Sequence, residues 1–263
     1  MVDSATKRLL KRYAAKYETA EFLDGDPSWF MHQVEGTANR EATAFVASCL
    51  SFGSRKQFLP KIQCLLDCAD GDIDAWVRKG GFERDFSCGC GDCFYRFFTH
   101  GHMHGFFRAY RTLLERDGTL GGYVRREANG DGYAAVSAIC RYFADAGSDA
   151  VVPKNAQSAC KRVCMFLRWM VRDGSPVDLG LWAGFIDRRS LVIPLDTHVL
   201  QQSVRLGLLT GGASSMGAAR RLTAELAEVF PDDPLKGDFA LFGYGVNSVA
   251  RGKGKAANTA KQG

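Results

Sequence analysis

Three observations predict a nearly all-helical fold. Most apolar residues recur with the 3.6-residue period of a helix, and few segments alternate apolar and polar residues as strands do. The chain has 263 residues, and 46% of them are hydrophobic, which is enough to fill the core of one large domain or two small ones. We therefore expect a helical protein that folds without help from bound groups.

The amino-terminal half should form helices separated by short turns. Asp26-Pro27 marks one turn, and the glycine-rich segment 88–93 marks another. The segment 41–52 is strongly apolar, so it should be a buried helix that ends at Gly53. The expected helices cover residues 4–17, 29–34, 41–52, 54–68, 72–79 and 92–116.

The carboxy-terminal half continues the helical pattern after the turn at 129–132. The expected helices cover residues 133–146, 156–172, 179–186, 197–206, 216–230 and 235–244. Beyond Ala250 only Arg, Lys, Gly, Ala, Asn, Thr and Gln remain, and these residues cannot build a core. Residues 251–263 should therefore be a disordered basic tail.

Charge and cysteine usage favour a cytoplasmic protein. Four of the positive charges that make up the net charge of +5 lie in the last thirteen residues. Net charge alone is therefore weak evidence for nucleic-acid binding. No run reaches the roughly 18 apolar residues of a membrane span, and the amino terminus lacks the apolar core of a secretory signal. The nine cysteines are odd in number and scattered through expected helices, which indicates reduced thiols.

Lys161 lies near the start of an expected helix within a basic stretch. Residues 151–172 contain no Asp or Glu, and such a local positive patch suits phosphate binding. A lysine amine attacks carbon only when it is neutral, so a nucleophilic Lys161 needs a pKa lowered by burial or by neighbouring cations. The alternative is an amphipathic surface helix whose basic residues are simply solvated.

Asp196 follows the apolar run 191–195 and precedes the expected helix at Thr197. Aspartate is a favoured helix N-cap, and a cap alone could account for this residue. A capping carboxylate is also fixed in place and held ionised near the positive end of the helix dipole. Such an anion is useful where positive charge develops on a sugar ring. His198 is expected to be structural.

Three segments resemble the helix-hairpin-helix DNA glycosylase superfamily: residues 161–170, 193–199 and 233–245. The nearest likeness is to the archaeal 8-oxoguanine DNA glycosylases. By this resemblance Asp196 is the catalytic aspartate and Lys161 the Schiff-base nucleophile. The glycine-containing hairpin that normally precedes the lysine is replaced by residues 153–159. The four-cysteine motif of some relatives is absent, because no cysteine follows Cys164, so no cofactor is expected.

The resemblance also implies an architecture and a function. It implies two helical subdomains with a cleft between them: residues 1–35 plus 175–250, which carry Asp196, and residues 36–174, which end in the lysine helix. The implied protein is a monomeric base-excision repair glycosylase with lyase activity, working at the nucleoid of a bacterial cytoplasm. Its partner would be double-stranded DNA with a damaged base, such as an oxidised purine, and no membrane. Over most of its length the chain also resembles an uncharacterised bacterial family of unknown function.

Base excision requires further contacts, for which the sequence offers candidates. The target nucleotide is swung out of the duplex and held between aromatic or apolar groups. Trp169 and Trp182 are candidates for that stacking, and burial in the core is their alternative role. Basic side chains would meet the phosphates; the candidates are Arg55, Lys154, Arg162 and Arg168.

Two other functions stay open. The same scaffold could bind DNA or a modified nucleotide without cleaving it. A zinc-stabilised interaction module is the other possibility, because Cys88, Cys90 and Cys93 precede three histidines at 100, 102 and 104. The alternative for this segment is a glycine-rich loop before an aromatic helix.

Overall fold

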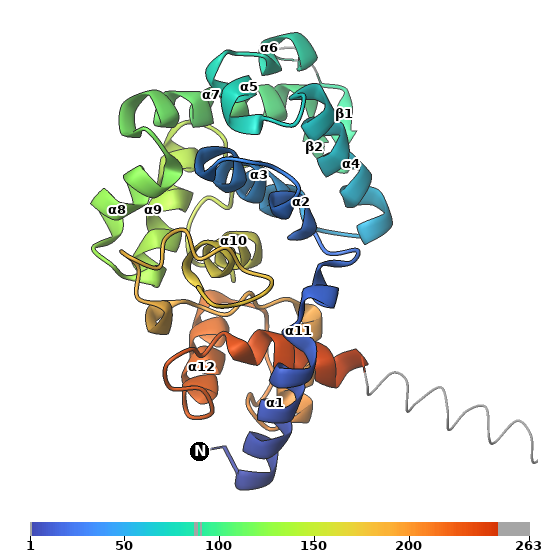
Figure 1. The fold of residues 1–263 in the computed structure, drawn as a ribbon, viewed down its shortest axis with the longest axis vertical. Coiled ribbons are helices and arrows are strands. Elements are labelled where there is room, and N and C mark those ends of the chain that lie inside the picture. The colour runs from blue at the N-terminus through green and yellow to red at the C-terminus, as the bar shows by residue number, and fades with distance from the viewer. Residues whose placement is uncertain (1, 87–88, 90, 247–263) are drawn as a thin grey trace, which may run out of the picture.

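The computed structural model describes residues 2–86, 89 and 91–246, and it is mostly helical (Figure 1). This confirms the all-helical prediction. Among the described residues, no helix is both long and apolar enough to cross a membrane. Met1, Cys88, Cys90 and the predicted tail 251–263 lie outside the described residues.

The helices of the first half follow the predicted order closely. They are α1 Ser4–Tyr17, the 3-10 helix η1 Ala20–Leu23, α2 Trp29–His32, α3 Thr37–Leu50, α4 Arg55–Cys68, α5 Ile73–Arg78 and α6 Phe82–Asp85. The predicted bounds of the first helix, 4–17, are those observed for α1. Asp3 caps this helix by accepting hydrogen bonds from the backbone N–H groups of Ala5 and Thr6.

The second half contains a small hairpin and further helices. They are β1 Cys93–Tyr95, β2 Phe98–Thr99, α7 His100–Asp117, α8 Leu120–Ala128, α9 Gly132–Asp145, α10 Lys161–Val171, η2 Arg188–Ser190, α11 Thr197–Arg205 and α12 Met216–Ala227. Residues 236–246 form one more helix.

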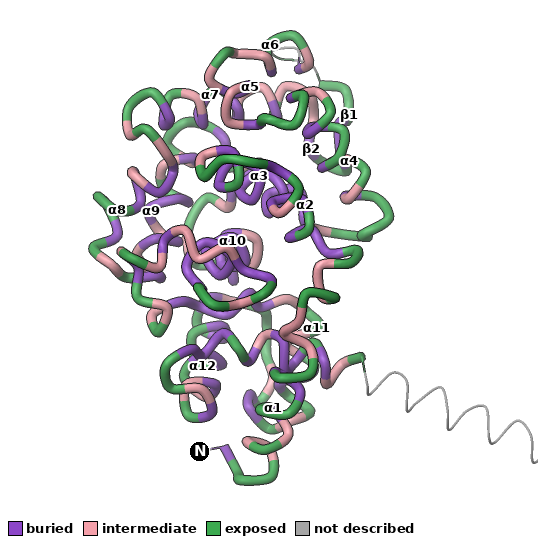
Figure 2. Tube along the Cα trace, in the orientation of Figure 1, coloured by how far each residue is buried: buried purple, intermediate pink, exposed green. Residues whose placement is uncertain are grey.

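The predicted burial of the apolar segment 41–52 is confirmed over most of its length. Helix α3 is buried from Glu41 to Leu50 and crosses the centre of the upper part of the molecule (Figure 2). The Phe45 ring lies at the middle of an aromatic cluster. Ring centroids of α7, α9 and α10 residues lie within 5.7 Å of it: Phe106, Tyr110, Phe143 and Phe166. This cluster holds α10, and with it Lys161, against the core.

The prediction of one helix over 92–116 is wrong in its first part. Residues 93–99 form the antiparallel hairpin β1–β2, in which Cys93 pairs with Thr99. Arg96 lies at the turn with a φ of 53°. The helix starts at His100, because the Thr99 side chain accepts a hydrogen bond from the His102 backbone N–H at 3.1 Å. A strong local cap therefore sets the start of α7.

Two other helix predictions need correction. Residues 156–160 are not helical, because Cys160 has left-handed backbone angles (φ 45°) and α10 begins after it. Residues 179–186 form turns. Their backbone N–H groups bond to the last carbonyls of α10, with 2.7 Å from Leu179 to Trp169 and 2.7 Å from Trp182 to Met170. These hydrogen bonds satisfy the last backbone carbonyl groups of α10, and the segment that makes them forms turns and not a new helix.

Helix α8 was not predicted, since Gly121 and Gly122 lower its intrinsic helix propensity. Tertiary contacts stabilise it instead. The buried carboxylate of Glu41 accepts hydrogen bonds from the backbone N–H groups of Leu120 and Gly121 at 2.8 and 3.2 Å. A Cβ on Gly121 would lie 2.6 Å from the Trp182 indole nitrogen, so only glycine fits there.

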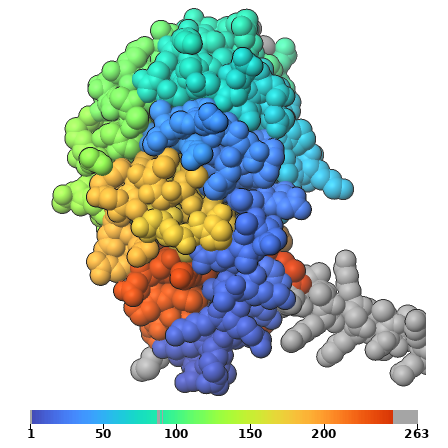
Figure 3. Space-filling model, viewed as in Figure 1, coloured from blue at the N-terminus to red at the C-terminus, as the bar shows by residue number. Residues whose placement is uncertain are grey.

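The amino-terminal segment packs against the carboxy-terminal one. The Val2 backbone N–H donates to Glu228 at 3.1 Å, and Lys7 forms an ion pair with the same carboxylate at 3.3 Å. The Tyr13 and Tyr244 rings lie 6.2 Å apart. Figure 3 shows the blue amino-terminal segment against the orange and red carboxy-terminal segments. The exact subdomain bounds, 1–35 plus 175–250 and 36–174, remain a prediction.

Candidate active site

A pocket of about 1080 Å³ opens beside the start of α10. Its walls come from the start of α10, the start of α11, the helix at 236–246 and two loops near residues 26 and 52. These segments are far apart in the chain. The pocket therefore joins residues that only the fold brings together.

Lys161 is the first residue of α10 and lines this pocket. Its amine nitrogen Nζ lies 3.5 Å from the Met165 sulfur. Burial lowers the pKa of Lys161, and the nearby Arg168 charge lowers it further, against Asp196 and other carboxylates, which raise it. The net direction is downward. Lys161 is thus neutral at lower pH than an ordinary lysine.

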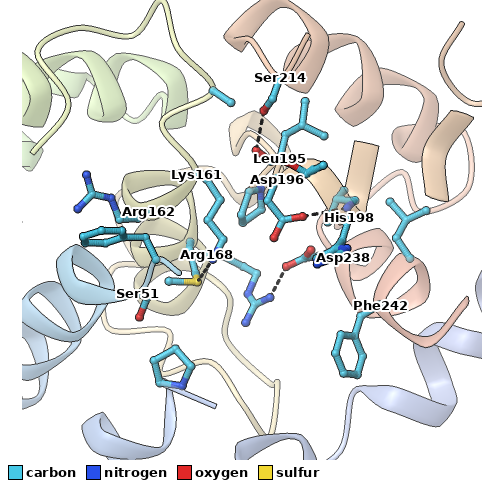
Figure 4. Close-up of a pocket in the computed structure, with 18 of the residues that line it drawn as sticks. Ser51, Lys161, Arg162, Arg168, Leu195, Asp196, His198, Ser214, Asp238 and Phe242 are labelled. Carbon is cyan, nitrogen blue, oxygen red and sulfur yellow. Dashed lines mark hydrogen bonds and ion pairs between the residues drawn. The ribbon is translucent and has the colours of Figure 1, made fainter. Parts of the chain in front are cut away.

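Asp196 caps α11 and lines the same pocket. One carboxylate oxygen accepts a hydrogen bond from the Val199 backbone N–H at 2.9 Å. The preceding carbonyl, of Leu195, accepts one from the Ser214 hydroxyl at 3.0 Å. In Figure 4 the side chains of Lys161 and Asp196 point into the same space between α10 and α11. The fold therefore brings together the two residues that the sequence singled out.

Asp238 is a third charged residue at the pocket wall, and the sequence did not single it out. Its carboxylate forms an ion pair with Arg168, as Figure 4 shows. Burial raises the pKa of Asp238, as does the nearby charge of Asp196, while Arg168 and Lys161 lower it; the net direction is upward. The sequence did contain a signal, because Asp238 is an acidic residue directly before the apolar run Phe239–Phe242.

A buried network of charges holds the far end of α10. Arg172 donates two hydrogen bonds to Asp233, each of 2.8 Å, and one to Glu18 of 2.6 Å. It also pairs with Asp178, whose carboxylate accepts from Arg168 at 3.2 Å. The network ties the lysine helix to the end of α1 and to the carboxy-terminal segment.

The predicted stacking role of Trp169 and Trp182 is wrong. Their exposed fractions are 0% and 2%, and neither lines the pocket. The Trp182 indole N–H donates to the Glu41 carboxylate at 2.8 Å, which explains why this ring is held in the core. The aromatic pocket residues include Phe242, which is 36% exposed, and Phe22, whose ring centroid lies 5.0 Å from that of Phe242.

The predicted phosphate contacts divide into two groups. Arg168 is buried and ion-paired with two carboxylates, so the prediction for it is wrong. Arg162 donates a hydrogen bond to the Cys49 carbonyl, and its guanidinium lies over the Phe52 ring at 5.1 Å. Its guanidinium is therefore engaged by groups of the protein itself. Arg55, which pairs with Asp26 at 3.4 Å, and Lys154 are exposed and remain candidates.

The cysteine and histidine segment shows no metal cluster in its described part. Cys93 is exposed, and its thiol donates to the Arg96 carbonyl at 3.0 Å. His100 and His104 pack against phenylalanine rings, and His102 takes part in the cap of α7. Among the described residues, no three His, Cys, Asp or Glu side chains are grouped to hold a metal ion. Cys88 and Cys90 lie outside this part.

A protein-family model matches most of the chain. Residues 26–247 match the model of a family described as protein of unknown function (DUF2400). No curated protein matches the chain. No solved structure matches it either.

Proposed function

Because the chain belongs to this family of unknown function (DUF2400), its activity has to be argued from the site, and we propose that it is a base-excision DNA glycosylase with associated lyase activity. One observation carries this proposal. Lys161, with a pKa lowered by burial, and Asp196, fixed by capping α11, line one open pocket. A desolvated amine beside a fixed carboxylate is the pair needed to displace a base from a sugar.

The chemistry assigns each residue a step. The neutral Lys161 amine attacks the sugar carbon C1′, and the electrons of the C1′–N bond leave with the base, which takes up a proton. The Asp196 carboxylate stabilises the positive charge that develops on the sugar ring. The attached nitrogen then loses a proton, the ring oxygen gains one, and the ring opens to a Schiff base. Loss of a C2′ proton with departure of the 3′ phosphate cleaves the strand.

The pocket can receive a flipped nucleotide. Its volume of about 1080 Å³ lies just above the usual range for small-molecule sites, which is roughly 300–1000 Å³. Phe242 and Phe22 provide aromatic faces at the wall, in place of the two buried tryptophans. A flipped base is held by stacking on such faces.

A hairpin next to the pocket offers a surface for duplex DNA. Phe97, at the turn between β1 and β2, is 59% exposed, and its ring lies 4.9 Å from that of the pocket residue Phe52. Arg96 at this turn is an exposed basic residue whose side chain lies next to Gly53, and the exposed Arg55 and Lys56 follow shortly after that glycine. An apolar wedge flanked by cations is how several proteins part base pairs and hold phosphates.

Borohydride trapping tests the proposal directly. Duplexes carrying one oxidised or deaminated base, or an abasic site, are incubated with the protein and sodium borohydride, which reduces a Schiff base to a stable amine. The wild-type chain should form a covalent protein–DNA adduct, and Lys161→Ala should not. Lys79→Ala, an exposed lysine on the end of α5, is the matched control and should trap normally.

The same experiment can overturn the proposal. If neither an adduct nor released base is found across the lesion panel, the catalytic role of Lys161 is wrong. DNA binding that persists in that case, and weakens as salt rises, would identify a binding protein on the same scaffold. An adduct that survives Lys161→Ala would move the nucleophile to another amine.

A further inference from the structure

Two cysteines meet at the start of the lysine helix. The Sγ atom of Cys160, the residue before Lys161, lies 3.9 Å from the Sγ atom of Cys140 on α9. Both residues are buried, with exposed fractions of 3% for Cys160 and 0% for Cys140, but only Cys160 is among the residues that line the pocket. The pair is therefore asymmetric, because Cys160 borders the pocket and Cys140 does not.

The backbone at Cys160 is unusual. Its φ of 45° and ψ of 38° lie in the left-handed region, which a residue with a side chain enters at a cost. Glycine or asparagine would enter it more easily, yet a cysteine is present. Cys160 directly precedes α10, so its thiol lies near the positive end of the helix dipole, although no backbone N–H group of α10 donates a hydrogen bond to it.

The surroundings of Cys160 favour the thiolate more than those of the other buried cysteines. The pKa of Cys160 is lowered to about 7, and the hydrogen bond from the Cys140 thiol is the largest cause. Burial raises this pKa, whereas the hydrogen bond with Ser158 and the Arg162 charge lower it further. The Asn155 carbonyl, 3.2 Å from Sγ, accepts from the protonated thiol and opposes ionisation. Burial raises the pKa of Cys49 to about 12, and it raises that of Cys164 as well.

We propose that Cys160 is a modification site for hydrogen peroxide and that Cys140 resolves the product into a reversible disulfide beside Lys161. The Cys160 thiolate attacks one peroxide oxygen, the O–O bond breaks, and hydroxide leaves, which gives a sulfenic acid. Cys140 loses its proton as its sulfur attacks Sγ of Cys160, and the sulfenic hydroxyl leaves as hydroxide. The two hydroxide ions and two protons make two water molecules.

Oxidation changes the edge of the pocket. The thiol hydrogen bond to Asn155 is lost, because a disulfide sulfur carries no proton. This bond ties Asn155 to the residue before α10, next to the backbone hydrogen bond from Met216 to Gln157, and Ser158 lines the pocket. The inference does not depend on which reaction Lys161 performs, since it concerns the cysteine pair alone.

Peptide mass spectrometry on the full chain tests this inference. The reduced protein is treated with hydrogen peroxide in the presence of dimedone, which captures sulfenic acids, and is then digested. The wild type should form a Cys140–Cys160 disulfide that dithiothreitol reverses. Cys140→Ser should instead carry dimedone on Cys160, and Cys160→Ser should leave Cys140 reduced. A lowered pKa gives Cys160 more thiolate at neutral pH, so Cys160 should be oxidised before the exposed Cys64.

Cys64→Ser is the control, and it should leave the disulfide unchanged. Oxidation of Cys64 or Cys93 while Cys160 stays reduced would overturn the inference, as would a Cys160 adduct that forms no disulfide with Cys140 present. If Cys140→Ser does not fold, the disulfide map of the wild type decides alone. Increased amide exchange over residues 155–158 after oxidation would support the predicted loosening.

Discussion

Replacing Arg172 by methionine should destabilise the protein strongly, because this arginine is the centre of the buried charge network. Its side chain is 1% exposed and makes four hydrogen bonds to three carboxylates, those of Asp233, Asp178 and Glu18. Burial lowers the pKa of Arg172, but the hydrogen bonds to Asp233 and the carboxylate charges outweigh burial, so the net direction is upward. The guanidinium is therefore held charged by its partners.

The expected loss follows from what the substitution leaves behind. Removing one partner of a buried ion pair costs about 3–5 kcal/mol, because the remaining charge is desolvated and uncompensated. Methionine fills much of the same space, so the cost comes from charge and not from a cavity. In a chain of this size each kcal/mol lowers the Tm by about 2–4 °C, so a drop of roughly 10 °C is expected.

The pH dependence gives a second readout. In the wild type burial raises the pKa of Asp178, the charges of Arg168 and Arg172 lower it, and the net direction is upward. Without Arg172 the pKa of Asp178 rises further, so the folded variant takes up a proton before the unfolded chain does. Folded-state proton uptake stabilises the fold as pH falls. The deficit relative to wild type should therefore be smaller at pH 5 than at pH 7.

Urea denaturation at both pH values measures the free energy of unfolding. Arg189→Met is the matched control, because Arg189 pairs with Asp187 on the surface, where solvent screens the charges, so the exchange should leave the free energy of unfolding nearly unchanged. A loss below about 1 kcal/mol for Arg172→Met, or a deficit that does not change with pH, would refute the reasoning.

Three further substitutions test other parts of the structure. Asp196→Asn keeps the cap of α11 but removes the anion, so borohydride trapping should slow roughly 100-fold. Asp196 raises the pKa of Lys161, so the pH at which trapping is half-maximal should also fall; an unchanged pH profile would contradict the pairing. Trp182→Phe leaves the buried Glu41 without one donor and should cost about 1–3 kcal/mol in urea denaturation, with DNA binding unchanged. Phe97→Ala should weaken binding of duplex DNA roughly tenfold, because losing one stacked base contact costs about 1–3 kcal/mol, while the Tm stays constant. Fluorescence anisotropy measures the affinity. Equal affinity of variant and wild type would show that the hairpin is not part of the DNA-binding surface.

Local signals in the sequence determined most helices and the Asp196 cap. The bounds of α1 agree with the prediction, and so does the end of α4 at Cys68. A helix end depends on hydrogen bonds between residues three or four positions apart, and a capping side chain can be read from the sequence. The start of α7 at His100 is also set by a local cap, that of Thr99, which the helical pattern of the preceding aromatic residues concealed.

Tertiary contacts decided the rest of the site. Trp182 is in the core because a carboxylate from α3 accepts its N–H, and Arg168 is unavailable to phosphate because Asp238 pairs with it from 70 positions away. Asp238 likewise lines the pocket because packing between distant segments brings it beside Arg168. The sequence determined which residues could form helices, caps and charged groups. Which of these groups meet water, a partner or the pocket is fixed by packing between distant segments, because burial and pairing are properties of the surroundings and not of the residue itself.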